Sequence, residues 1–129
     1  MRKEGIIAII LDKEGRFLIG KRSMYKSSAP GYWVPISGII EEGENEINAV
    51  VREVFEELGV VSQPIEKIGI LDTDDGLYRL HWWKVEIIEG KPKVTSNEFS
   101  EIRWINLKEF KLLFPIHQQN ILFLELYLK

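Results

Sequence analysis

The 129-residue sequence contains no cysteine, which excludes disulfide bonds, thiolate metal sites and a cysteine nucleophile. Long hydrophobic runs are also missing: the apolar run at residues 6–11 is too short for a signal-peptide core or a membrane span. A surplus of basic residues is missing as well, since the formal net charge is -3. An acidic chain offers no basic field to nucleic-acid backbones. We therefore expect a cytoplasmic protein that binds neither membranes nor nucleic acid.

The overall composition is that of an ordinary globular chain. Hydrophobic residues make up 45% and charged residues 29% of the sequence. A chain of this length can bury one sizeable core. We expect a single domain over residues 1–129.

Local patterns predict strands and helices along the whole chain. The continuous apolar run at 6–11 is typical of a strand buried on both faces. Strands covered on both sides by helices form an α/β/α sandwich, which is the expected architecture. The expected strands are 6–11, 16–22, 32–35, 65–71, 77–88 and 101–105, and the expected helical segments are 46–58 and most of 107–128, interrupted at Pro115.

The segment Glu46 to Leu58 contains neither glycine nor proline, and Gly59 follows it as a natural stop. Asn45 is the better candidate for the N-cap by residue type, and Glu44 is the alternative. Apolar residues recur at helical spacing and predict one stripe that faces a core. The stripe consists of Ile47, Val50, Val51, Val54, Phe55 and Leu58.

Three carboxylates share the other side of this helix. Glu53, Glu56 and Glu57 fall within an arc of roughly 100°, and Ala49 lies one turn earlier, where a small side chain leaves room for a ligand. Carboxylates crowded at this spacing repel one another unless a cation neutralises them. Hard oxygen ligands suit a divalent cation. A metal site is therefore one interpretation, and a solvated charged helix face is the other.

The loop before the helix decides between these interpretations. Residues 38–60 read Gly-x5-Glu-x7-Arg-Glu-U-x-Glu-Glu-x-Gly-U, with U an aliphatic residue, and so the segment resembles the Nudix box at every defined position. The resemblance implies a Nudix hydrolase with an α/β/α sandwich and a divalent cation, Mg²⁺ or alternatively Mn²⁺. It also implies that Glu53, Glu56 and Glu57 hold the cation, with a carbonyl contributed by Gly38. For Glu53 the alternative role is to orient the nucleophilic water as the base.

The resemblance assigns further roles inside and outside the box. Arg52 is expected to orient the carboxylates. Glu44 is a candidate for the same network, for a water-mediated contact with the metal and for substrate binding. Glu98 is the expected general base, with Glu101 as the weaker candidate, because both precede the strand that carries Trp104. Arg22 ends a predicted strand, where relatives often place a basic residue on the substrate phosphates, and Lys21 competes for that role.

Other polar residues have simpler interpretations. His81 lies in the predicted strand 77–88 and is interpreted as a structural residue. Gln118, Gln119 and Asn120 lie where some relatives place amides that read a base. Gly38 and Gly43 have the spacing of a Walker loop, but Glu44 and Asn45 stand where lysine and serine or threonine are required, so this motif is excluded.

The leading hypothesis is a Mg²⁺-dependent hydrolase that cleaves a nucleoside diphosphate linked to another moiety. Within that class we favour a MutT-like enzyme that converts a nucleoside triphosphate to a monophosphate and pyrophosphate. Nucleotide-sugar or dinucleoside polyphosphate hydrolysis is the enzymatic alternative, and a non-catalytic nucleotide sensor is the alternative of another class. The sequence leaves the oligomeric state open between a monomer and a homodimer.

Overall fold

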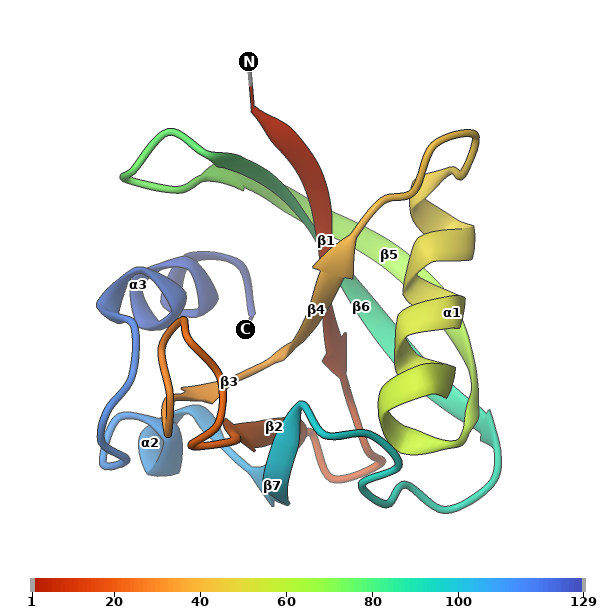
Figure 1. Ribbon diagram of the computed structural model, residues 1–129. Coiled ribbons are helices and arrows are strands. Elements are labelled where there is room, and N and C mark those ends of the chain that lie inside the picture. The colour runs from red at the N-terminus through yellow and green to blue at the C-terminus, as the bar shows by residue number, and fades with distance from the viewer. Residues whose placement is uncertain (1, 129) are drawn as a thin grey trace.

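The computed structural model describes residues 2–128, and Met1 and Lys129, the two ends of the expected domain, lie outside the described residues. Two sheets and three helices make up this part of the chain (Figure 1). The elements in chain order are β1 Lys3–Ile10, β2 Phe17–Arg22, β3 Trp33–Val34, β4 Ile36–Ile39, α1 Glu46–Leu58, β5 Val61–Asp72, β6 Tyr78–Glu89, β7 Phe99–Ile105, α2 Leu107–Phe110 and α3 Gln118–Tyr127.

The larger sheet is mixed and has the strand order β4-β1-β6-β5. β1 runs parallel to β6, and the other neighbours in this sheet are antiparallel. α1 and α3 lie on opposite sides of it (Figure 1). The expected α/β/α sandwich is therefore confirmed. The smaller sheet, β3-β2-β7, is antiparallel, and the sequence patterns did not separate it from the larger one.

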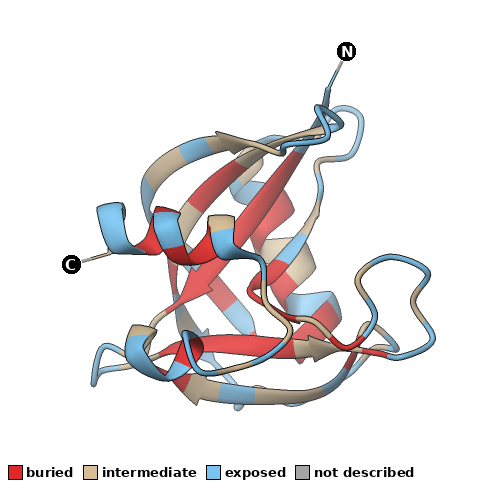
Figure 2. Cartoon of the chain, turned by 90° about the vertical axis from the view of Figure 1, so that its left-hand side faces the viewer, coloured by how far each residue is buried: buried red, intermediate tan, exposed pale blue. Residues whose placement is uncertain are grey.

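The continuous apolar run of β1 serves two hydrophobic cores. Ile6 and Ala8 pack in the cluster that contains Val50 and Val54 of α1. Ile7 and Ile9 alternate with them and pack in a second cluster with α3. Figure 2 shows the buried residues in red, along the strands in the middle of the molecule. Successive side chains of a strand point to opposite faces, so one apolar strand fills both layers, as the sequence predicted.

The boundaries of α1 agree with the sequence. The Asn45 side chain accepts a hydrogen bond from the Asn48 N–H at 2.8 Å, and Gly59 closes the helix in the left-handed conformation with φ 70°. The expected apolar stripe is wrong in two places, because Ile47 and Phe55 are exposed. The helix is rotated so that Ala49 and Glu57 take buried positions instead.

Other boundaries differ from the expectation. β5 begins at Val61 and passes through Pro64, which an edge strand tolerates because its outer N–H groups need no ladder partner. Residues 36–39, expected as loop, form β4 against β1. The C-terminal segment is helical only at 107–110 and 118–127. None of the helices within residues 2–128 has the length and apolarity needed to cross a membrane.

Candidate active site

The second half of α1 carries Glu53 and Glu57 at the edge of the core and Glu56 on the solvated face. The Glu57 side chain is nearly buried, with the residue 7% exposed, and its Oε2 accepts a hydrogen bond from Ser96 Oγ at 2.5 Å. Glu53 is half-buried and faces β4, while Glu56 is exposed. Ala49, one turn earlier, is fully buried in the core, so the expectation that it leaves room for a ligand is wrong.

Gly38 in β4 allows Glu53 to occupy this position. A Cβ atom on Gly38 would overlap the carboxyl group of Glu53. Gly38 also pairs with Ile6 of β1, so the backbone at this point is fixed by the larger sheet. A residue with any side chain here would have to push the carboxylate away, and the glycine is therefore required by close approach.

Arg52 joins the loop before α1 to the glutamates on it. Its Nε donates to Glu44 Oε2 at 2.8 Å, and its Nη1 donates to Glu53 Oε1 at 2.5 Å and to Glu56 Oε1 at 2.7 Å. Its Nη2 donates to the carbonyl oxygen of Ile39 at 2.9 Å. The planar guanidinium supplies several donors in one fixed geometry, which an ammonium group cannot do.

The same contacts separate the pKa values of the carboxylates. Hydrogen bonds from Arg52 and from the Glu41 N–H lower the pKa of Glu44 to about 2. Burial raises the pKa of Glu53 and of Glu57, and repulsion from Glu56 adds to it for both, although Arg52 and Ser96 oppose the effect. Carboxylates held in this way ionise more readily once a cation is near.

Glu98 lies in the loop before β7 and faces the same region. Its Oε1 is 2.7 Å from Lys26 Nζ, and its Oε2 is 3.7 Å from Arg22 Nη1. Its backbone N–H donates to Ser96 Oγ, the same hydroxyl that holds Glu57. Glu101, the weaker candidate for the base, pairs with Arg103 on β7 instead.

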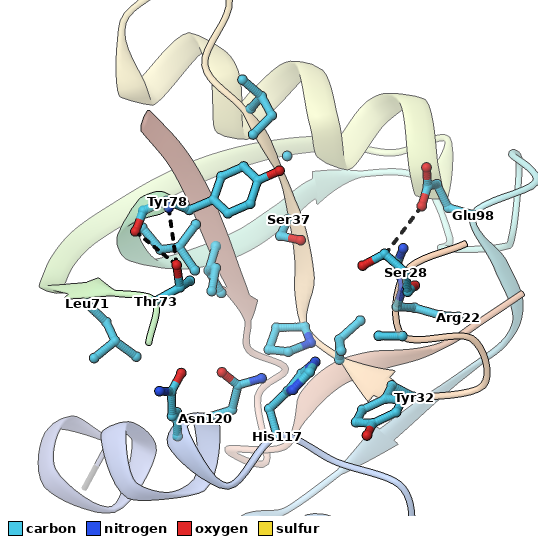
Figure 3. Close-up of a pocket in the computed structure, with 18 of the residues that line it drawn as sticks. Arg22, Ser28, Tyr32, Ser37, Leu71, Thr73, Tyr78, Glu98, His117 and Asn120 are labelled. Atoms are coloured by element: carbon cyan, nitrogen blue, oxygen red, sulfur yellow. Dashed lines mark hydrogen bonds and ion pairs between the residues drawn. The ribbon is translucent and has the colours of Figure 1, made fainter. Parts of the chain in front are cut away.

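A cleft of about 1260 Å³ connects these residues to α3. Arg22 and Glu98 lie toward one end, and Leu71, Thr73 and Asn120 toward the other (Figure 3). Glu53 is also among the lining residues. Tyr32 and His117 stack between them, with ring centroids 4.7 Å apart. Gln118 and Gln119 also line the cleft. Lys21, the competitor of Arg22, is not among the lining residues.

The donor set fits a divalent cation by its chemistry, although its arrangement is not that of a closed metal site. Within residues 2–128, the acidic and histidine side chains form no group of three or more that surrounds one point. Arg52 takes one oxygen from Glu53 and one from Glu56, and the exposed Glu56 must turn from it to face Glu53 and Glu57. The carboxyl groups of Glu53, beside Gly38, and of Glu57 have raised pKa values and supply the hard oxygen ligands that suit Mg²⁺ or Mn²⁺.

Two residues of this site were missed by the sequence reasoning. Lys26 and Ser96 both contact carboxylates at the site. Lys26 lies in the loop after β2, and Ser96 lies in the loop before β7. Neither belongs to a periodic segment or to the box. His81, by contrast, is buried and bonded to Glu4 and Lys67, which confirms its structural interpretation.

The family follows from the sequence model of the NUDIX domain, which matches residues 1–127. The chain belongs to the Nudix family. Its expected nature as an enzyme, a Nudix hydrolase, is confirmed. It is 26% identical over 130 residues to a CTP pyrophosphohydrolase of Escherichia coli, covering 99% of this chain and 93% of that protein. It is 34% identical over 118 residues to the nucleoside triphosphatase NudI of Escherichia fergusonii, covering 81% and 83% respectively.

Solved structures agree on the Nudix fold. A crystal structure of a MutT NUDIX hydrolase from Burkholderia pseudomallei superposes with a TM-score of 0.83 at 24% identity, and the match covers 97% of each chain. This likeness extends from β1 to α3 and so includes both sheets that border the cleft. The Nudix box therefore lies in this chain in its usual fold.

Proposed function

We propose that this Nudix hydrolase cleaves the pyrophosphate linkage of a nucleoside triphosphate, releasing a monophosphate and pyrophosphate, in a Mg²⁺-dependent reaction. The observation that carries the proposal is the half-buried Glu53, which lines a cleft that also contains basic side chains. Glu56 and Glu57 follow it on α1, just outside the lining of the cleft. Two relatives are named for activity on nucleoside triphosphates, which supports this subclass. The proposal treats residues 1–129 as one Nudix domain of a cytoplasmic enzyme.

Each residue has a proposed role that follows from its contacts. Glu53, Glu56 and Glu57, with the carbonyl of Gly38, would hold Mg²⁺, which when bound neutralises phosphate oxygens and acidifies a water molecule. Arg52 orients Glu53 and Glu56 through Nη1. Because Glu44 is bound by Arg52 and lies outside the lining of the cleft, we propose that it positions Arg52 and does not bind substrate.

Glu98 and Arg22 complete the proposed reaction. A carboxylate at the position of Glu98 can accept the proton of the attacking water, because it faces the cleft from a loop and not from the core. Arg22 ends β2 beside it and presents a guanidinium for bidentate contact with phosphate oxygens. The part of the cleft lined by Tyr32, His117 and Asn120 is left for the nucleoside.

A second enzymatic candidate is favoured by the length of the cleft. The lining continues past Asn120 to Thr73 and Asp74 in the turn between β5 and β6. A cleft of about 1260 Å³ is larger than typical ligand sites of roughly 300–1,000 Å³. A nucleotide sugar or a dinucleoside polyphosphate would use this additional space.

The proposal is tested by measuring phosphate and pyrophosphate release with and without Mg²⁺. The substrates are nucleoside triphosphates, their oxidised forms, nucleotide sugars and dinucleoside polyphosphates. Glu56→Gln and Glu57→Gln are run beside Glu89→Gln, an exposed glutamate outside the cleft. We expect Mg²⁺-dependent turnover that collapses in the first two variants and persists in the third. Nucleotide binding without turnover of any compound would overturn the proposed reaction and favour a sensor.

A further inference from the structure

The cleft contains few cationic groups that a polyphosphate can use. Among the described residues that line it, the guanidinium and ammonium groups are those of Arg22, Lys26 and Arg52. Arg52 is already held by Glu44, Glu53 and Glu56 and by a backbone carbonyl. Within residues 2–128, the Arg22 guanidinium donates a hydrogen bond only from Nε, to the backbone carbonyl oxygen of Ser28 at 3.0 Å. A phosphate chain that entered the cleft would therefore meet Lys26 and the Nη groups of Arg22 as its available cationic partners.

Both of these cations face one carboxylate. Lys26 Nζ lies 2.7 Å from Glu98 Oε1, and Arg22 Nη1 lies 3.7 Å from Glu98 Oε2. The Lys26 and Glu98 side chains are about one third exposed, at 34% and 36%. Ion pairs that remain in contact with water are weak and open readily, so the pair does not lock these side chains in place.

The competition for these cations has a clear direction. A phosphate chain carries several negative charges and presents several acceptor oxygens, whereas Glu98 offers a single charge. Charge-assisted hydrogen bonds to phosphate are strong, and Arg22 adds the geometry for a bidentate contact. Glu98 cannot keep both cations while the same cations neutralise a phosphate chain beside it.

We infer that Lys26 is a phosphate-binding residue, and that substrate binding transfers Lys26 and Arg22 from Glu98 to the phosphate oxygens. The inference rests on the proposed function, since it takes the ligand of the cleft to be a nucleoside polyphosphate. Its consequence is that the Glu98 carboxylate loses its cationic partners only when a phosphate chain is bound. The base is thereby freed in the presence of substrate and neutralised in its absence.

The exchange predicts that the Glu98 charge lowers the affinity for the ligand, an effect that a purely structural ion pair would not have. Glu98 competes with the ligand for Lys26, so removing its charge should tighten ligand binding. Without Lys26 there is little left to compete for, and the gain should shrink. Glu41, which also lines the cleft but faces Arg52 at 3.6 Å, serves as the matched control for the general effect of removing one negative charge.

The experiment measures binding by calorimetry with an α,β-methylene nucleoside triphosphate analogue and Mg²⁺ at fixed ionic strength. The proteins are wild type, Glu98→Gln, Lys26→Gln, the double variant and Glu41→Gln, each checked for folding by thermal unfolding. We expect Glu98→Gln to tighten binding about three- to five-fold, the scale of one exposed ion pair. We expect Lys26→Gln to weaken it by a similar factor, and Glu98→Gln to gain less than about two-fold in the Lys26→Gln background.

The possible results separate the two proposals. Glu98→Gln binding that equals or falls below the wild type would overturn the exchange, and so would an equal gain in the Lys26→Gln background or in Glu41→Gln. Failure of the wild-type protein to bind the analogue would overturn the proposed function itself. A gain confined to Glu98→Gln in the presence of Lys26 would support the exchange.

Discussion

Glutamates at the two ends of α1 have pKa values that are shifted in opposite directions. At the first turn, Glu46 accepts hydrogen bonds from Lys67 Nζ and Trp83 Nε1, at 3.1 and 2.9 Å. Burial opposes its ionisation, but these bonds outweigh burial and lower the pKa of Glu46. In the second half of the helix, burial prevails and the pKa values of Glu53 and Glu57 are raised.

The difference lies in how each carboxylate is matched. Glu46 has a lysine of its own on β5, and so it fastens the start of the helix to the larger sheet. Glu53 and Glu56 share the single guanidinium of Arg52, and Glu57 is held by a neutral hydroxyl. In the first arrangement the lysine neutralises the charge of the carboxylate. The second has more negative charge than its partners neutralise, which is what a site that receives a cation requires.

Gly38→Ala gives the largest expected effect, because it disturbs the second end alone. The new Cβ would displace the Glu53 carboxyl, and we expect turnover to fall roughly a thousand-fold, about 4 kcal/mol in activation free energy. Gly15→Ala is the control: Gly15 has φ 79° in a turn with nothing within 4 Å, so strain should lower its stability while turnover persists. Steady-state kinetics and thermal unfolding of both variants check this, and a loss of less than ten-fold in Gly38→Ala would contradict the required close approach.

Arg52→Lys gives the next largest effect. One ammonium group cannot serve Glu44, Glu53 and Glu56 at once, so we expect turnover to fall roughly a hundred-fold, about 3 kcal/mol. Arg16→Lys, in a partly exposed pair with Asp12 outside the cleft, should leave turnover unchanged. The kinetics of the two variants decide the matter. Equal behaviour would mean that the charge of Arg52 matters and its planar geometry does not.

Ser96→Ala sharpens the comparison by removing a neutral partner. The Ser96 hydroxyl opposes the rise in the pKa of Glu57, so its loss should raise that pKa further. Glu57 then ionises at higher pH, so the acidic limb of kcat/KM should move to higher pH and activity on that limb should fall. Ser96→Thr keeps the hydroxyl and should restore the wild-type profile. An unshifted limb in Ser96→Ala would show that this hydroxyl does not tune Glu57.

The smallest expected effects are on stability without metal. The folded-state pKa of Glu46 is lowered, so its contribution is present above the unfolded pKa and is lost as the pH falls through the folded value. The pKa of Glu57 is raised, so its contribution is present below the unfolded pKa and is lost as the pH rises through the folded value. At pH 7 with a chelator, Glu46→Gln should lose about 1 kcal/mol and Glu57→Gln should gain about 0.5 kcal/mol.

Urea unfolding between pH 3 and pH 8 measures these differences. At the acidic end, both variants should approach the wild type in free energy of unfolding. The wild-type carboxylates are then protonated and are neutral like the glutamines. Added Mg²⁺ should stabilise the wild type but not Glu57→Gln. A loss of stability in Glu57→Gln at pH 7 would show that the protein stabilises the charged Glu57 carboxylate even without a metal.

The features that the sequence predicted are those encoded locally. Asn45 and Gly59 mark the ends of α1 because a cap and a left-handed stop depend on neighbouring residues alone. The box offsets place Glu53, Glu56 and Glu57 on one side of the helix in the same way. The rotation of the helix on the sheet is a tertiary property, and so Phe55, at 58% exposed, was wrongly assigned to the core.

The missed residues depend on contacts between distant parts of the chain. Ser96 reaches Glu57 across 39 positions, and Lys26 reaches Glu98 across 72. Neither residue type nor spacing indicates such a pair, since serine and lysine in loops are common and usually solvated. Both contacts depend on the tertiary position of the loop before β7. This loop is hydrogen-bonded to the end of α1 and to the loop after β2.

Pro35 lies where the chain passes directly from the smaller sheet to the larger one. β3 belongs to the smaller sheet and β4 to the larger one, and this buried proline is the single residue between them. A pyrrolidine ring fixes φ, so the step from one sheet to the other has little torsional freedom. Tyr32 borders β3 on one side of this proline, and Gly38 lies in β4 on the other side, three residues later. One short segment, residues 32–38, thus supplies both an aromatic wall of the cleft, Tyr32, and the glycine against which the Glu53 carboxylate lies.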